Sequence, residues 1–243
     1  MSRVKLELFT DLDMHLFIER GIRGGISMIS HRFSSANNKY LESYDEVKPS
    51  KYILYLDANN LYGWAMSQFL PTHGFEWIKE PVNFMEISDE SDIGFILEVD
   101  LDYPENLHDL HNDYPLAPET LNVTNDMLSP YFYIKIKYYI NDKLLFTDTD
   151  SLCYEISTSD VYKDMEKDSH LFDTSDYPKN HVLNNETNKK VLGKMKDELS
   201  SSLAVEFVGL KPKMYSLKSV AMEKKTAKGV SKRIIQQQIR HSD

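Results

Sequence analysis

The stretch that most constrains the fold reads Leu144-Leu145-Phe146-Thr147-Asp148-Thr149-Asp150-Ser151-Leu152. Two apolar runs, 143–147 and 151–156, flank an Asp-Thr-Asp triplet, which predicts a tight hairpin with two acids at its tip. Because residues i and i+2 of a strand face the same side, the carboxylates of Asp148 and Asp150 could converge on one point. The alternative is a polar turn that binds nothing.

A third acid follows another apolar run. Residues 51–56 read Lys-Tyr-Ile-Leu-Tyr-Leu, which predicts a buried strand with Asp57 at its C-terminal end. If this strand neighbours the hairpin, Asp57, Asp148 and Asp150 form a three-carboxylate cluster, whose repulsion needs cations to neutralise it. Such hard oxygen ligands suit Mg²⁺, and two ions would suit phosphoryl or nucleotidyl transfer.

Weaker patterns complete the expected fold. Further strands are predicted at 95–101, 206–210 and 214–217, and helices at 12–20 and 223–240. We therefore expect an α+β fold in which an antiparallel sheet carries the acids at one edge and helices cover its back.

Charge is distributed unevenly along the chain. The net charge is −10, and 41% of the residues are hydrophobic, enough to build a core. Residues 207–243 contain nine basic and two acidic residues, a balance of +7, which leaves −17 for residues 1–206. A basic end suits contact with a phosphate backbone, although a solvated helix face would carry the same charge.

The sequence lacks the signals of export and of membrane insertion. The first residues contain no signal-peptide apolar stretch, and no apolar run is long enough to cross a bilayer. The lone cysteine, Cys153, fits a reducing compartment. We expect an intracellular protein that is not secreted and has no membrane partner; the nucleus is one candidate location.

Three ordered motifs resemble those of protein-primed family B DNA polymerases. Asp57-Ala58-Asn59-Asn60-Leu61-Tyr62 resembles motif A, and Phe146-Thr147-Asp148-Thr149-Asp150-Ser151 resembles motif C. Gly209-Leu210-Lys211-Pro212-Lys213-Met214-Tyr215 resembles the Lys-x-Tyr motif. The surrounding sequence is similar to the polymerases of Polinton (Maverick) transposons and related viruses, and the resemblance covers nearly the whole chain.

The resemblance implies a role for each acid. The fold would be the antiparallel palm sheet of a family B DNA polymerase with flanking helices. Asp57 and Asp150 would be the principal ligands of two Mg²⁺ ions, for which Mn²⁺ could substitute. Asp148 would be an auxiliary acid near the primer end, so that all three acids count as catalytic.

The resemblance also implies binding residues and partners. The backbone at Asn60 and Leu61 would contact the triphosphate, and Tyr62 would stack under the incoming sugar. The implied DNA-binding residues are Lys211, Lys213 and Tyr215. The partners would be a DNA primer–template, deoxynucleoside triphosphates and a terminal protein that serves as primer.

The same resemblance predicts how the chain is divided. Residues 1–50 would lead into the palm, 51–130 would carry motif A, and 131–217 would carry motif C and the Lys-x-Tyr motif. Residues 218–243 would begin a basic thumb.

One family motif does not occur in this sequence. The fingers motif Lys-x-x-x-Asn-Ser-x-Tyr-Gly is not found between Asp57 and Asp150, which are 93 residues apart. The resemblance therefore implies a truncated polymerase, whose nucleotidyl transfer would be impaired by the loss of the fingers. The alternatives are a catalytically inactive DNA-binding remnant of a transposon or viral polymerase and the product of a decayed gene.

Two further patterns carry alternatives. His108, Asp109, His111 and Asp113 could form a metal cluster, but their spacing matches no standard zinc motif and a surface loop explains them as well. The aromatic and basic run 131–139 could stack on single-stranded DNA or form a helix that packs on the sheet. The sequence shows no Walker loop, nucleophile elbow or Ser/His/Asp arrangement.

Overall fold

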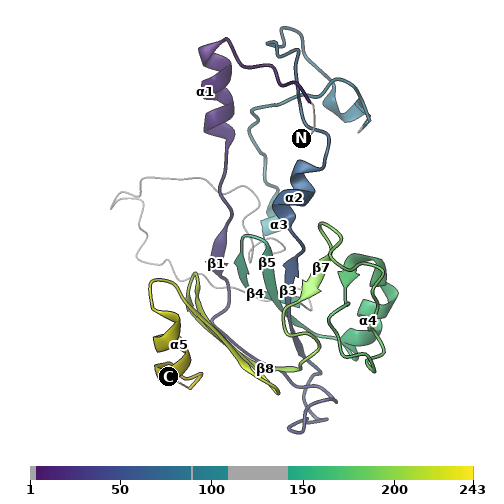
Figure 1. Cartoon of the computed structure of the whole chain (residues 1–243), viewed down its shortest axis with the longest axis vertical. Coiled ribbons are helices and arrows are strands. Elements are labelled where there is room, and N and C mark those ends of the chain that lie inside the picture. The colour runs from purple at the N-terminus through teal and green to yellow at the C-terminus, as the bar shows by residue number, and fades with distance from the viewer. Residues whose placement is uncertain (1–3, 89, 109–141, 243) are drawn as a thin grey trace. The chain divides into compact units, whose positions relative to one another are not determined.

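The computed structural model describes residues 4–88, 90–108 and 142–242. The chain divides into two compact units. The first unit comprises Met1–Gly24 and Tyr62–Asp102, and the second comprises Gly25–Leu61 and Tyr103–Asp243. The expected α+β class is confirmed, because the second unit contains two sheets with mainly antiparallel strands and a few short helices (Figure 1).

A six-stranded sheet brings the two acid-bearing strands side by side. Its order is β1-β4-β5-β3-β7-β6. The strands are β1 (Ser27–Ile29), β3 (Tyr52–Ala58), β4 (Asp142–Asp148), β5 (Ser151–Ile156), β6 (Phe172–Asp173) and β7 (Met195–Asp197). β4 and β5 form the predicted hairpin, β5 pairs antiparallel with β3, and β6 pairs in parallel with β7.

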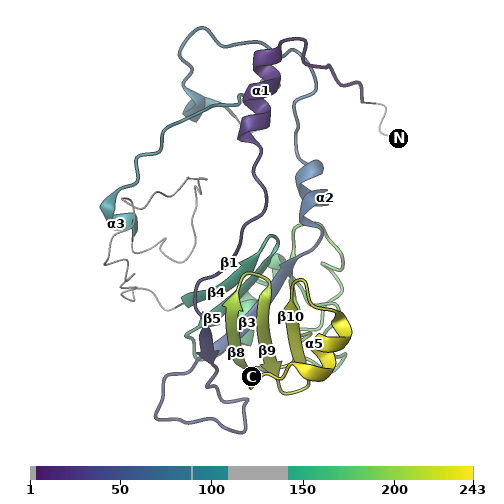
Figure 2. The ribbon, with the colours of Figure 1, turned by 90° about the vertical axis from the view of Figure 1, so that its left-hand side faces the viewer.

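A four-stranded antiparallel sheet packs against the first sheet. Its order is β10-β9-β8-β2. The strands are β2 (Phe33–Ser35), β8 (Ala204–Lys211), β9 (Met214–Ser219) and β10 (Glu223–Ala227). Figure 2 shows β8, β9 and β10 side by side, with α5 (Lys232–Gln238) following β10. The strands expected at 206–210 and 214–217 are thereby confirmed.

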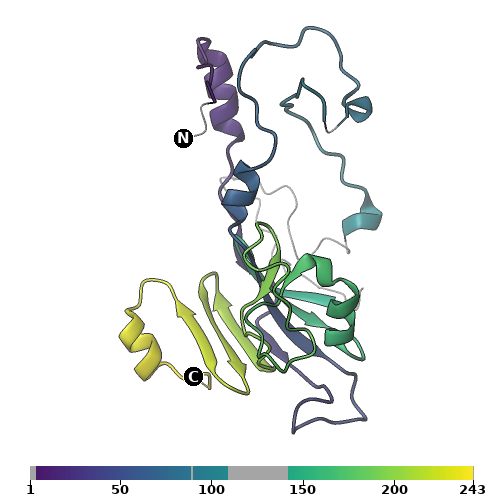
Figure 3. The same cartoon turned by 45° about the vertical axis from the view of Figure 1, so that its right-hand side comes forward.

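Both faces of β3 are covered, and this explains why its sequence is a continuous apolar run rather than an alternating one. Ile53 and Tyr55 face a core shared with the four-stranded sheet. Tyr52, Leu54 and Leu56 face the other way, toward α4 (Val161–Lys167). Figures 1 and 3 show α4 on one side of β3 and the four-stranded sheet on the other.

Two predicted elements are wrong. Residues 95–101 form no strand, and most of their side chains are exposed, because alternation produces a strand only where a neighbouring strand pairs with it. Residues 223–240 do not form one helix. Pairing with β9 makes 223–227 a strand, and Gly229 then adopts a positive φ of 88°, which ends the strand before α5 begins.

Two strands were missed in the segment before β3. β1 pairs with β4, and β2 pairs with β8, so this segment contributes to both sheets. Each strand has only three residues, which is too short for a period-2 pattern to be recognised.

The first unit has few contacts of its own. The helix expected at 12–20 is confirmed as α1 (Leu12–Gly21), and its N-cap residue Asp11 accepts a hydrogen bond from Trp77 Nε1 at 2.9 Å. Its other helical turns are η1 (Phe84–Glu86) and most of α2 (Leu61–Met66). None of the side chains described in this unit is buried.

The described part of the second unit contains two more short helices, α3 (Glu105–His108) and the 3-10 helix η3 (Ser169–Leu171). Within the described ranges, no helix combines the length and the apolar character that crossing a membrane requires.

Replacing Phe146 tests the core between the two sheets. Phe146 is buried and stacks on Tyr215 with ring centroids 4.2 Å apart. We expect Phe146→Ala to lower the free energy of unfolding by about 3–5 kcal/mol, measured by urea denaturation. The matched change Phe33→Ala, at a side chain 60% exposed on β2, should cost less than about 0.5 kcal/mol. Equal losses would contradict this assignment of the core.

Candidate active site

Strand register aligns a row of polar side chains across the six-stranded sheet. Asp148 lies opposite Ser151, Ser151 lies opposite Asp57, and Asp57 lies opposite Lys196. Directly opposed residues on antiparallel strands point to the same face. Since Asp57 is two residues from Tyr55, the row lies on the face that looks toward the four-stranded sheet.

Asp57 is held by a neighbour within the sheet. Ser151 Oγ donates a hydrogen bond of 2.6 Å to Asp57 Oδ1, and the Ala58 amide donates to the carbonyl of Asp150 at 3.0 Å. Burial raises the pKa of Asp57 above its ordinary value, the Ser151 hydrogen bond lowers it, and the nearby charge of Asp150 raises it again. Asp57 and Asp150 are therefore close enough to repel each other when both are ionised.

Asp148 has a cationic partner within the protein. Lys213 Nζ forms an ion pair and a hydrogen bond with Asp148 Oδ1. Lys213 lies in the two-residue turn between β8 and β9, so this contact joins the hairpin of one sheet to a hairpin of the other. The two acids therefore differ. A lysine neutralises Asp148, whereas burial opposes the ionisation of Asp57.

Backbone strain is concentrated around these acids. Six non-glycine residues in the described part of the chain have positive φ, and three of them belong to this region: Asn60 (43°), Thr149 (63°) and Lys213 (59°). A β-branched residue such as Thr149 rarely adopts this conformation. Strain of this kind persists where the surroundings enforce it and is common at functional sites.

Gly25 helps to hold the strained turn. The Thr149 amide donates to the carbonyl of Ile26 at 2.8 Å, which brings residue 25 against the turn. A Cβ on Gly25 would lie 2.5 Å from Thr149 Cγ2 and 3.0 Å from Thr149 Cβ. Glycine is therefore required here because the two backbones approach closely.

The other predicted site residues differ in their exposure to solvent. Asn60 lies in the turn after β3 and Leu61 begins α2, whereas Tyr62 belongs to the first unit and is 66% exposed. Lys211 is exposed at the end of β8. Tyr215 is only 7% exposed, and its hydroxyl lies 3.1 Å from that of Tyr55 in the core.

The chemistry of the acids can be compared with the needs of Mg²⁺. Among the described residues, no three His, Cys, Asp or Glu side chains are grouped so as to hold a metal ion. Mg²⁺ is commonly bound through one or two carboxylates, with waters and substrate phosphates as its remaining ligands. Asp57 and Asp150 together fit that smaller donor set.

Two charged residues of this region were missed by the sequence patterns. Lys224 Nζ forms an ion pair with Glu198 Oε2 and lies 4.4 Å from the ring centroid of Tyr55. The Glu198 amide donates to the carbonyl of Tyr55 at 2.8 Å. Lys224 falls in the segment predicted as a helix, and Glu198 follows a three-residue strand, so no periodic pattern could indicate their contact.

A Ser–His–Glu arrangement, which the sequence did not reveal, lies on the four-stranded sheet. His241 Nδ1 is 2.8 Å from Ser216 Oγ, and His241 Nε2 is 2.9 Å from Glu206 Oε1. Ser216 is buried in the middle of β9 and paired on both sides, with Val208 and Lys225. A nucleophile needs free backbone donors beside it to stabilise an oxyanion. We assign these contacts to attachment of the C-terminal segment.

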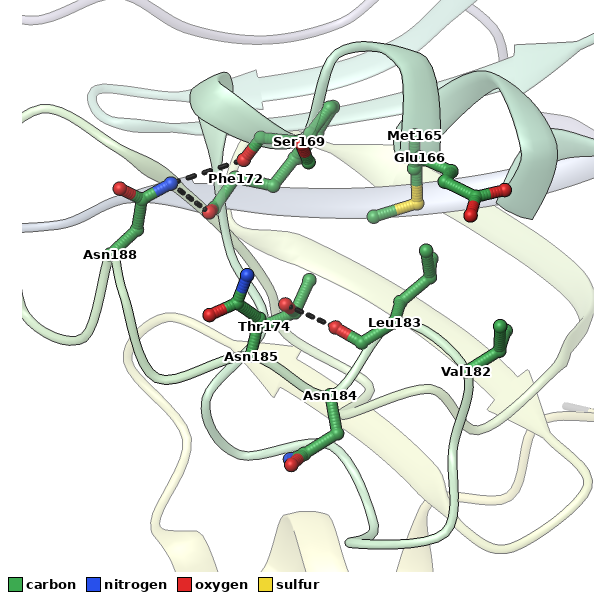
Figure 4. Close-up of a pocket in the computed structure, with 10 residues that line it drawn as sticks. All are labelled: Met165, Glu166, Ser169, Phe172, Thr174, Val182, Leu183, Asn184, Asn185 and Asn188. Atoms are coloured by element: carbon green, nitrogen blue, oxygen red, sulfur yellow. Dashed lines mark hydrogen bonds between the residues drawn. The ribbon is translucent and has the colours of Figure 1, made fainter.

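A small pocket lies beside α4 (Figure 4). It has a volume of about 210 Å³ and is lined by Met165, Glu166, Ser169, Phe172, Thr174, Val182, Leu183, Asn184, Asn185 and Asn188. The side-chain amide of Asn188 donates to the backbone carbonyls of Ser169 and Phe172, and the Thr174 hydroxyl donates to the backbone carbonyl of Leu183. These polar groups hold the loop together, and none of the predicted site residues lines the pocket.

The possible His/Asp metal cluster and the aromatic run named in the sequence analysis lie mostly outside the described residues. Asp109, His111, Asp113 and the aromatic run 131–139 all lie there. His108 is described, and its Nε2 lies 2.9 Å from the carbonyl of Tyr103.

Comparisons with known proteins leave the family open. No protein-family model, curated protein or solved structure matches the chain.

Removing the charge of Asp57 should stabilise the metal-free protein. The pKa of Asp57 is higher in the folded protein than in the unfolded chain. The free energy of unfolding therefore falls as the pH rises from the ordinary aspartate pKa to the folded-state pKa, and it falls no further at higher pH. We expect Asp57→Asn, whose amide oxygen can still accept from Ser151, to raise the urea midpoint at pH 7.5 in EDTA. The advantage should disappear at pH 3. The exposed Asp168→Asn is the control, and a lower midpoint for Asp57→Asn would refute the expectation.

A methyl group at Gly25 should disturb the acid-bearing turn. We expect Gly25→Ala to lower the free energy of unfolding by about 1–3 kcal/mol, since Thr149 must move away. Gly94→Ala is the control, because a Cβ there meets nothing within 4 Å. Unfolding curves that coincide for the two variants would show that the turn is not tightly packed.

Proposed function

We propose that this chain is the palm core of a DNA-directed DNA polymerase of the protein-primed family B type, which transfers deoxynucleotides to a DNA or protein-linked 3′ end. The observation that carries the proposal is the register of β3 on β5. It aligns Asp57 with Ser151, next to the turn that contains Asp150. Two polymerase-like motifs that are far apart in sequence thus meet at one end of the sheet.

Further support comes from the third motif. Lys213, which belongs to the Lys-x-Tyr resemblance, forms an ion pair with Asp148 of the motif C resemblance. Tyr215 of the same motif stacks on Phe146, two residues before Asp148. The three motifs are therefore linked by direct contacts and not by order in the sequence alone.

Each acid then has a distinct task. Asp57 and Asp150 would hold Mg²⁺, which would polarise the phosphoryl group and neutralise charge during in-line displacement. Ser151 orients the Asp57 carboxylate by donating to Oδ1. Lys213 neutralises Asp148, which lowers the negative charge that an incoming phosphate would meet. Lys211, exposed beside the turn, would contact the DNA backbone.

A second candidate is a catalytically inactive DNA-binding remnant. It is favoured by the sequence between Asp57 and Asp150, where the fingers motif does not occur. The fingers lysine would normally bind the triphosphate in the family that the chain resembles.

Primer extension distinguishes the two candidates. Purified protein is incubated with Mg²⁺, four deoxynucleoside triphosphates and a primed template. We expect extension that Asp150→Asn reduces to background, because a metal ligand is lost, whereas the exposed acid variant Asp168→Asn retains it.

Two other outcomes would change the conclusion. Equal extension by the protein and Asp150→Asn would exclude the acid site as the source of activity. Binding of primer–template without any extension would favour the inactive remnant.

A further inference from the structure

Lys224 is directed toward the acids by strand pairing. It lies opposite Leu217, a fully buried residue of the core between the sheets, so its side chain starts on the inner face of β10. The side chain remains 30% exposed, so it is not enclosed in the core. Lys225, the next residue, belongs to the other face and donates to the carbonyl of Ile239 at 2.7 Å.

The Lys224 ammonium is held in place by two groups next to Asp57. It lies 4.4 Å from the ring centroid of Tyr55, which is two residues before Asp57 on the same face of β3. It also forms an ion pair with Glu198, whose amide is bonded to the carbonyl of Tyr55.

Glu198 is itself a neighbour of Asp57. Its amide donates to the carbonyl of Tyr55, and the residue before it, Asp197, lies opposite Leu56, so the backbone of Glu198 runs beside that of Asp57. A ligand that brings cations to Asp57 and presents phosphate oxygens nearby could replace Glu198 as the partner of Lys224. Side chains of lysine are flexible enough to exchange one anionic partner for another.

We propose that Lys224 is a phosphate-binding residue of this site, which exchanges Glu198 for a phosphate group of the substrate. The inference rests on the proposed function and deepens it, because it supplies a lysine for a chain in which the fingers motif does not occur. The phosphate belongs either to the triphosphate of an incoming nucleotide or to the primer strand.

Binding measurements with two probes test this assignment without relying on catalysis. Inorganic triphosphate with Mg²⁺ is titrated by calorimetry, and a fluorescent primer–template is titrated by anisotropy. We expect Lys224→Ala to lower the affinity for one of the two probes by about tenfold or more, because a hydrogen bond to a charged group is lost. Lys224→Arg should retain most of the affinity.

Glu198→Gln is the decisive second variant. It removes the competing carboxylate, so we expect binding of the same probe to become tighter. A purely structural ion pair predicts instead that both variants lose stability and that neither binds more tightly. Lys163→Ala is the control, because Lys163 is exposed on α4, which covers the opposite face of the sheet.

Each outcome decides a separate question. Weaker binding of triphosphate alone assigns Lys224 to the incoming nucleotide, and weaker binding of DNA alone assigns it to the primer strand. Unchanged binding of both probes by Lys224→Ala, or a wild-type protein that binds neither, would overturn the inference. The proposed function is judged independently, by extension that depends on Asp150.

Discussion

The antiparallel pairing of β3 with β5 is the constraint on which the rest of the structure depends. It sets Asp57 opposite Ser151 and, through the hairpin, beside the residues of the β4–β5 turn. Strand side chains alternate between faces, so a slip of one residue would turn Asp57 toward α4 and bring an apolar side chain to the acid row. The register is secured by burial on both faces, because a slip would also exchange the two sets of core residues.

Partly buried acids are costly, and the surrounding structure compensates each of them differently. Asp148 is paired with Lys213, and Glu198 is paired with Lys224, so both pairs cross from one sheet to the other. Asp57 accepts a hydrogen bond from the neutral hydroxyl of Ser151, and its pKa is raised, mainly by burial. Burial thus opposes the ionisation of Asp57, and a cation bound beside this carboxylate would favour it.

The sequence predicted the strands and the hairpin that local apolar patterns and turn residues determine. The strands at 51–56 and 151–156 have enough apolar residues to be recognised, and the acid-bearing hairpin follows from the residues of its turn. Residues 95–101 show the limit of the same reasoning, since alternation says nothing about whether a pairing strand exists. The contact joins Lys224 of β10 to Glu198, which follows β7 and is 26 positions earlier, and only the tertiary fold determines it.

The two acids of the Asp-Thr-Asp triplet illustrate why local rules fail at a turn. The period-2 rule assumes extended backbone, but Thr149 has a φ of 63°, so the rule does not extend from Asp148 to Asp150. Asp148 is the last residue of β4 and contacts Lys213, whereas Asp150 lies in the turn, with its carbonyl bonded to the amide that follows Asp57. The left-handed conformation of Thr149 thus separates the environments of two acids that are only two residues apart.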